Sequence, residues 1–232
     1  MRYWISRVWK RWVEFFSKQK TATSFELHDF DYRHYYTSGM LKKAFDKNEP
    51  ADAINDPTLQ IGDLLRLYPG VRDTAVDIGC GAGWISARLS RDFKQVIGIE
   101  PSAKAVAMAK EIFPAATHPN IQWRVGFAEP ELRALKLTTP TLFLTAVVLS
   151  HLLDHEVAAI CAALNAAAPV GSIVCLCECW GTDYHRFMWH VRTTAWWQAQ
   201  LPGWELDFYG PSIENIPDRH KGFRGRKREA SA

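Results

Sequence analysis

The feature that most constrains this chain is a glycine-rich turn, Asp77-Ile-Gly-Cys-Gly-Ala-Gly83. The apolar residues before Asp77 predict a buried strand, and Trp84 to Leu89 behind the turn predict the start of a helix. Glycines lack a Cβ atom and tolerate positive φ, so a ligand can lie against the backbone of such a turn. Glycines stand at three alternate positions: Gly79, Gly81 and Gly83. The sequence therefore predicts the front of a strand–helix–strand unit that binds a ligand at its first turn.

The spacing of the glycines separates two classes of ligand. A dinucleotide site uses G-x-G-x-x-G, which places the pyrophosphate at the helix N-terminus. Here the third glycine comes one residue early, and the sixth position is Trp84. Asp77 also precedes the first glycine by two residues, where a carboxylate repels a pyrophosphate but suits a cationic ligand that bears an amine. These features disfavour a nicotinamide dinucleotide, which remains an alternative.

An acid followed by Gly-x-Gly-x-Gly resembles the first motif of the class I S-adenosylmethionine-dependent methyltransferases. The resemblance covers about residues 58–228 and is closest over residues 71–179. It implies S-adenosylmethionine as the cofactor, S-adenosylhomocysteine as the product, and Asp77 with the three glycines as cofactor-binding residues. Glu100 ends the next apolar run and is expected to accept hydrogen bonds from both ribose hydroxyls, a charge-assisted contact that NAD sites share.

The resemblance implies further cofactor contacts outside the turn. Family members bind adenine after the third strand through a backbone amide and a polar side chain, which makes Ala128 and Glu129 candidates. The alternative for Glu129 is a solvated loop acid. Thr145 lies at the rim formed by the end of the fourth predicted strand. Tyr36, or its neighbour Tyr35, is a candidate for covering the methionine end, the alternative being a loop whose rings only anchor a cap.

Predicted strands and helices alternate and indicate a doubly wound, mostly parallel α/β sheet with helices on both faces. The predicted strands are Val71–Ile78, Gln95–Ile99, Ile121–Val125, Thr141–Val148 and Ile173–Cys179. The predicted helices are Thr58–Tyr68, Gly83–Ser90, Ala103–Phe113, one starting at Leu149, and one within Gly181–Gln200. The resemblance adds an antiparallel pair, Trp204–Tyr209 and Gly222–Arg228, separated by residues 210–218. The expected sheet therefore has seven strands, one of them reversed.

The length of 232 residues leaves room for one α/β domain, which we place at residues 57–232 behind an N-terminal amphipathic helix and cap or lid at residues 1–56. Residues 2–19 put large apolar side chains on one half of a helical wheel and Arg7, Lys10 and Arg11 on the other. We expect this apolar face to pack as a lid or as a homodimer contact. The alternative is peripheral contact with an anionic membrane at its cytoplasmic face.

Charge and cysteine usage bound the partners. A formal net charge of +3 does not by itself indicate nucleic acid, and no Asn/Asp-Pro-Pro-Tyr motif follows the fourth predicted strand, so the basic stretch Arg224–Arg228 is read as a solvated strand edge. Five cysteines, an odd number, predict a reducing cytoplasm. Cys175, Cys177 and Cys179 alternate along one strand and would spread over ~13 Å, too far to share one tetrahedral ion, so no metal site is predicted.

The cofactor brings its own leaving group, so the protein must place a nucleophile in line with the methyl carbon and remove its proton. His151, after the fourth predicted strand, is the first candidate base because imidazole titrates near neutral pH; its alternative role is packing at a helix start. His185 and Glu178 on the next rim segment are competing candidates. We expect methylation of a hydroxyl on a small-molecule, glycan or lipid-like acceptor. The alternatives are N- or C-methylation and an inactive cofactor-binding scaffold.

Overall fold

The computed structural model describes residues 61–146, 148–149, 152–177, 192–213 and 216–229. The predicted N-terminal helix and cap, which include Tyr36, lie outside these residues. The same is true of the three candidate bases His151, Glu178 and His185. The described residues form one α/β domain, and no helix within them is both long enough and apolar enough to cross a membrane.

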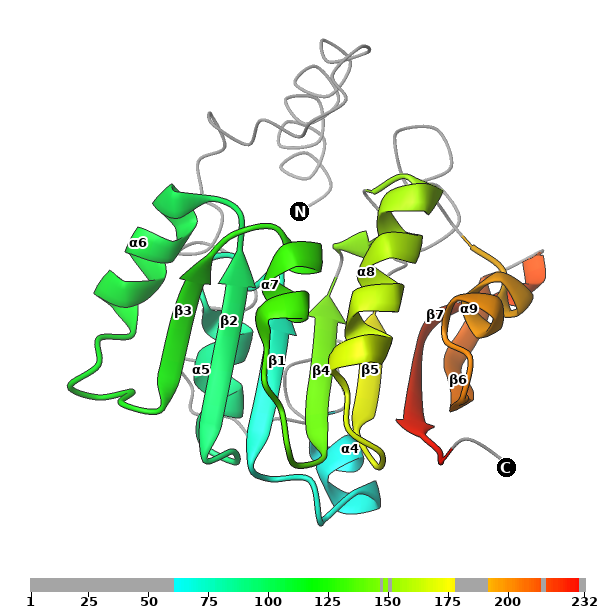
Figure 1. Ribbon diagram of the computed structural model, residues 1–232, viewed down its shortest axis with the longest axis horizontal. Helices are drawn as coiled ribbons and strands as arrows, with labels where there is room; N and C mark the ends of the chain where they lie inside the picture. Colours follow the sequence, from blue (N-terminus) through cyan, green and yellow to red (C-terminus); the bar gives the residue numbers. More distant parts are fainter. Residues whose placement is uncertain (1–60, 147, 150–151, 178–191, 214–215, 230–232) are drawn as a thin grey trace, which may run out of the picture.

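The described strands form one seven-stranded sheet in the order β3-β2-β1-β4-β5-β7-β6 (Figure 1). The strands are β1 Thr74–Ile78, β2 Gln95–Glu100, β3 Ile121–Val125, β4 Thr141–Ala146, β5 Ile173–Cys177, β6 Trp204–Ile213 and β7 Ile216–Lys227. Strands β1 to β5 pair in parallel, whereas β7 is antiparallel to both β5 and β6. The predicted doubly wound sheet with one reversed strand is confirmed.

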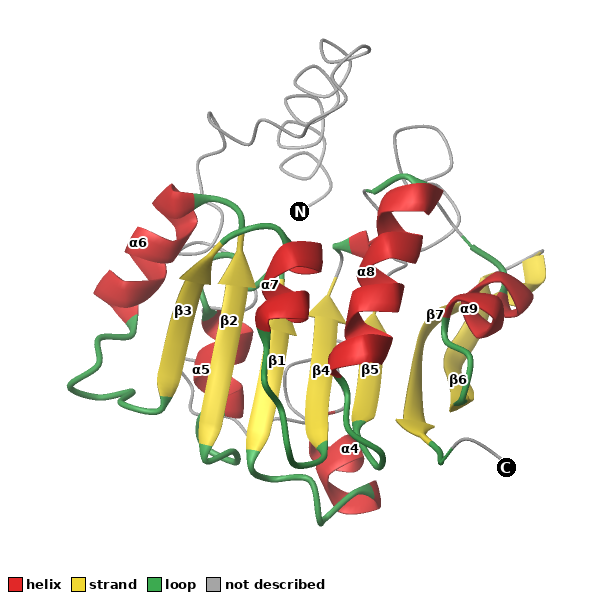
Figure 2. Cartoon of the chain, in the orientation of Figure 1, coloured by secondary structure: helices red, strands yellow, loops and turns green. Residues whose placement is uncertain are grey.

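Helices cover both faces of the sheet, as Figure 2 shows. They are α4 Ile61–Leu67, α5 Trp84–Leu89, α6 Ala103–Ile112, α7 Ala128–Ala134, α8 Asp154–Ala167 and α9 Thr194–Gln200. Helices α7, α8 and α9 pack on one face around Val76, Ile78 and Phe143. Helices α4 and α5 pack on the other face around Ala75 and Leu142, and α6 packs beside α5. Because a strand's side chains alternate between the two faces, β1 and β4, which are buried along nearly their whole length, serve both layers.

Helix α7 corresponds to none of the helices predicted from the sequence. Its first turn nevertheless carries helix-start features, because Glu129 and Glu131 are acidic and Pro130 occupies a position where no amide donor is needed. Phe127 is the N-cap residue and supplies no side-chain hydrogen bond. The helix lacks a side-chain cap at its start, which explains why the pattern was missed.

Two further boundaries differ from the predictions. Helix α8 begins at Asp154 rather than near Leu149, because the Leu153 amide donates to the Glu156 carboxylate at 2.8 Å and so marks the helix start. Leu153 is exposed. Strands β6 and β7 are longer than predicted and take in most of the expected separating segment, residues 210–218, of which residues 214–215 are not described.

Candidate functional site

The glycine turn lies at the carboxyl edge of the parallel strands. Ile78, the last residue of β1, pairs with Ile99 of β2 and with Thr145 of β4, so the three strands end at the same edge. The amides of Gly79 and Cys80 both donate to the Ile99 carbonyl, at 2.8 and 3.1 Å. The turn is therefore fixed to β2 where open α/β sheets bind their ligands.

The three glycines share positive φ but differ in what surrounds them. Gly79, Gly81 and Gly83 have φ of 73°, 53° and 85°, values that side-chain-bearing residues rarely adopt. A Cβ atom at Gly79 would overlap the Val148 side chain, and one at Gly83 would overlap the Trp123 ring. The space that these two glycines leave is therefore filled by the protein itself. That the glycines clear room for a ligand stays a prediction.

Glu100 joins the end of β2 to the glycine turn. Its side chain is buried, and its two carboxylate oxygens accept from the Gly81 amide at 3.1 Å and from the Ser102 amide at 3.0 Å. Burial raises the pKa of Glu100, and these two hydrogen bonds act against that rise. A carboxylate oxygen can accept two hydrogen bonds. Each oxygen of Glu100 thus retains capacity for a further donor, such as a ribose hydroxyl.

Asp77 lies at the end of β1 with only 1 % of its surface exposed. Its carboxylate accepts from the Ser86 hydroxyl of α5 at 2.6 Å. Burial raises the pKa of Asp77 to about 7, and the Glu100 charge adds to this, while the hydrogen bonds with Ser86 act in the opposite direction. Asp77 is therefore partly protonated at neutral pH, and a bound cation nearby would favour its charged form.

The other predicted cofactor contacts have mixed surroundings. Ala128 and Glu129 form the first turn of α7, so Glu129 is a helix residue rather than a loop acid. The Glu129 carboxylate forms an ion pair with Arg133, one turn later in the same helix. Thr145 is fully buried within β4. Contact of these residues with a cofactor stays a prediction, as do the roles of Tyr36, His151, Glu178 and His185.

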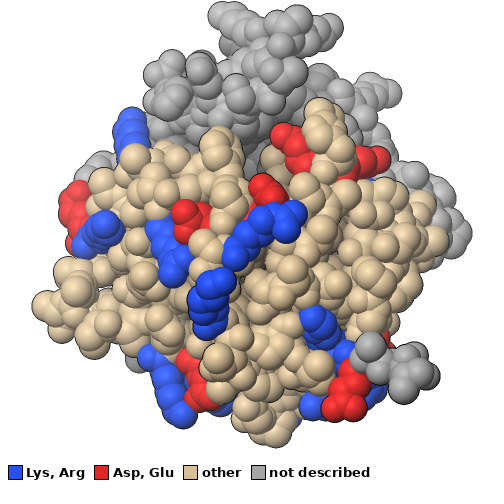
Figure 3. Space-filling view, in the orientation of Figure 1, with Lys and Arg blue, Asp and Glu red and all other residues tan. Residues whose placement is uncertain are grey.

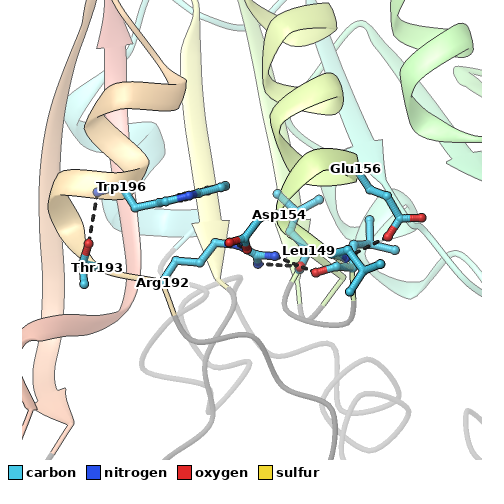
Figure 4. Close-up of polar contacts among 8 residues, drawn as sticks. Leu149, Asp154, Glu156, Arg192, Thr193 and Trp196 are labelled. Atoms are coloured by element: carbon cyan, nitrogen blue, oxygen red, sulfur yellow. Dashed lines mark hydrogen bonds and ion pairs between the residues drawn. The ribbon is translucent and has the colours of Figure 1, made fainter. Parts of the chain in front are cut away.

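Arg192 is a residue that the sequence analysis did not identify (Figure 4). Its Nη1 and Nη2 atoms donate to the carbonyls of Leu149 and Leu152 at 2.9 and 2.6 Å, and its Nε donates to Asp154 at 2.9 Å. Its guanidinium carbon lies 4.9 Å from the centroid of the Trp196 ring. No pattern at Arg192 signals this arrangement, because two of the acceptors named here are backbone carbonyls about 40 residues earlier in the chain.

These features define a class of protein. A mixed seven-stranded sheet with one reversed strand, a glycine turn after the first strand and a buried acid at the end of the second are the features of the class I S-adenosylmethionine-dependent methyltransferases. The described residues form a domain of this class, as the resemblance implied. Residues 75–171 match the family described as "Methyltransferase domain".

Relatives agree with this assignment. A probable S-adenosylmethionine-dependent methyltransferase of Saccharomyces cerevisiae is 34 % identical over 55 residues, which are 24 % of this chain and 19 % of the yeast protein. A putative methyltransferase of Dictyostelium discoideum is 40 % identical over 58 residues, 25 % of this chain and 20 % of that protein. The chain thus spans about a fifth of the length of the curated relatives it matches.

A solved structure with bound cofactor shows the same fold. CalS10, an amino pentose methyltransferase of Micromonospora echinaspora solved with S-adenosylmethionine bound, superposes with a TM-score of 0.55 at 14 % identity. The superposition covers 90 % of this chain and all of CalS10. At this identity the likeness concerns the fold.

Proposed function

We propose that the chain is a methyltransferase that binds S-adenosylmethionine at the turn between β1 and α5 and methylates a hydroxyl group of a small-molecule, glycan or lipid-like acceptor. The observation that carries the proposal is the buried Glu100 carboxylate, whose Oε2 accepts from the Gly81 amide at 3.1 Å. This contact brings together two features that would bind the cofactor. The carboxylate would accept hydrogen bonds from the ribose hydroxyls, and the glycine backbone would let the rest of the cofactor lie close to it.

The chain's own residues divide the binding between them. Glu100 would accept hydrogen bonds from the ribose hydroxyls, and the backbone of Gly81 would lie against the cofactor. Asp77 would act on the positively charged part of the cofactor, because its pKa of about 7 lets a nearby cation draw it into the charged form. Ala128 and Glu129, in the first turn of α7, would contact the adenine.

The cofactor, when bound, supplies the activated methyl group. The protein then has to orient the acceptor and take its proton. His151 follows β4 in the sequence and is the first candidate for this proton, with His185 and Glu178 as competitors. Tyr36 remains the candidate for covering the methionine end of the cofactor.

A small acceptor is supported by two observations. On the face seen in Figure 3, basic and acidic side chains are interspersed rather than gathered into one basic surface of the kind that binds nucleic acid. CalS10 acts on an amino pentose, and its fold is that of this chain. An acceptor that carries an amine makes N-methylation the second candidate reaction. We place the protein in the cytoplasm on its cysteine usage.

The test uses S-adenosylmethionine that carries a tritiated methyl group, incubated with the full chain and a metabolite extract. Label should appear in a small-molecule fraction and should be suppressed by added S-adenosylhomocysteine. An untreated extract gives the background. Cofactor binding without transfer to any fraction would favour the inactive scaffold. Quenching of tryptophan fluorescence by NADH, but not by S-adenosylmethionine, would favour the dinucleotide alternative.

A further inference from the structure

We propose that Arg192 is a positioning residue that holds the backbone following β4 against the glycine turn and thereby sets the affinity for the cofactor. This inference rests on the proposed function. The effect that we infer passes through the backbone carbonyls that Arg192 binds.

The hydrogen bonds of Arg192 fix three acceptors at once. The carbonyls of Leu149 and Leu152 lie three residues apart, and a single guanidinium donates to both, at 2.9 and 2.6 Å. The Nε atom adds the Asp154 carboxylate at 2.9 Å. Because the guanidinium donors are coplanar and rigidly spaced, this set fixes the relative position of the three acceptors. Lysine has one donor atom and cannot span the same set.

The burial of the Arg192 charge indicates that its contacts with the two carbonyls contribute more than its ion pair with Asp154. The Arg192 side chain is 3 % exposed, whereas that of its ion-pair partner Asp154 is 65 % exposed. A pair with such an exposed partner contributes little, and burial of a cation is unfavourable unless other groups compensate. The two carbonyls and the Trp196 ring, 4.9 Å from the guanidinium carbon, supply that compensation. Arg192 thus links α9 to the backbone after β4.

A direct path leads from this backbone to the glycine turn. Leu149 is buried, and the preceding residue is Val148. The Val148 side chain occupies the space over Gly79, where a Cβ atom would overlap it. Gly79 is the first glycine of the turn, and its amide donates a hydrogen bond to the Ile99 carbonyl of β2. A shift of the Leu149 carbonyl would therefore move the residue that packs on the cofactor turn.

The experiment measures S-adenosylhomocysteine binding by calorimetry for the full chain and four variants, each well below its melting temperature. Arg192→Met should weaken binding at least tenfold, and Arg192→Lys should give an intermediate loss. Asp154→Asn, which leaves both carbonyl contacts in place, should bind within twofold of the native chain. Arg224→Met is the matched control, since it removes another arginine–aspartate pair, Arg224 with Asp207, on the β6–β7 pair. Hydrogen exchange of the peptide covering residues 148–153 should accelerate only in the Arg192 variants.

A folded Arg192→Met protein that binds S-adenosylhomocysteine within twofold of the native chain would overturn the proposal, because a purely structural arginine would lower the melting temperature alone. If Arg192→Met does not fold, the Arg192→Lys variant is used instead. Native affinity of that variant for S-adenosylhomocysteine would overturn the proposal. If the native chain binds no S-adenosylhomocysteine, the proposed function fails. In that case the hydrogen exchange of residues 148–153 still tests the positioning role, and exchange in the Arg192 variants equal to that of the native chain would refute it.

Discussion

At the residue scale, Gly79 and Asp77 at the glycine turn have different physical requirements. Gly79 needs both a positive φ and the absence of a Cβ atom, because Val148 occupies the position that the atom would take. Asp77 is a carboxyl group with almost no contact with water and one close hydrogen-bond donor, Ser86. Each requirement leads to a separate experiment.

Gly79→Ala should destabilise the domain more than Gly203→Ala does. Both glycines have similar φ, 73° and 80°, but a Cβ atom at Gly203 would meet nothing within 4 Å. The Gly203 variant therefore measures the backbone cost alone, on the order of 1 kcal/mol. The Gly79 variant adds the displacement of Val148. Urea unfolding of both variants is the measurement, and equal losses of stability would show that Val148 yields without cost.

Asp77→Asn should change how the stability of the ligand-free protein depends on pH. The pKa of Asp77 rises from 3.8 to about 7 on folding, so between these values the folded protein holds a proton that the unfolded chain has released. The contribution of Asp77 to stability therefore falls as the pH rises from about 4 to about 7, by up to ~4 kcal/mol. Thermal melting across this range should give a shallower fall for the Asn variant. Parallel curves would contradict the raised pKa.

At the element scale, the order of the five parallel strands was predictable because hydrophobic periodicity reports it directly, whereas the final antiparallel pair was expected from the family resemblance. The same signal was weak at helix ends. Helix α7 starts without a side-chain cap at Phe127, and α8 starts at Asp154 although apolar residues precede it. The contacts of Arg192 with Leu149 and Leu152 were not predictable, because they are made to backbone carbonyls, and every residue type carries one. Gly81 and Glu100, by contrast, were predictable as neighbours, since the ends of adjacent parallel strands meet at one edge.

Lys227 makes a contact between elements that local sequence does not reveal. Its Nζ atom donates to the carbonyls of Asn165 and Ala168 at 2.6 and 2.7 Å, so the end of β7 caps the C-terminus of α8. Lys227→Met should lower the free energy of unfolding by ~1–3 kcal/mol, because hydrogen bonds from a charged group are lost. Lys94→Met, which removes an exposed pair with Asp73, is the control and should cost under ~0.5 kcal/mol. Equal effects would show that Lys227 does not cap the helix.

At the scale of the whole molecule, the amphipathic residues 2–19 stay a prediction that lies outside the described residues. If they pack as a lid or as a dimer contact, deletion of residues 1–19 should lower the melting temperature or change the oligomeric state, irrespective of lipid. If they bind a membrane, the deletion should abolish co-sedimentation with anionic vesicles, and salt should weaken the binding of the native chain. Sedimentation velocity and vesicle assays distinguish the two, and vesicle binding that survives deletion would exclude the membrane role.

The central claim is that Glu100 and the glycine turn form the cofactor site, and calorimetric titration of S-adenosylhomocysteine tests it most directly. The native chain should bind, and Glu100→Gln should lose ~1.5–3 kcal/mol of binding free energy, the range for a hydrogen bond to a charged group. Glu111→Ala, at an exposed position of α6, is the control and should bind as the native chain does. Melting curves should show that both variants are folded. A folded Glu100→Gln protein with undiminished affinity would contradict the account and place the ribose elsewhere.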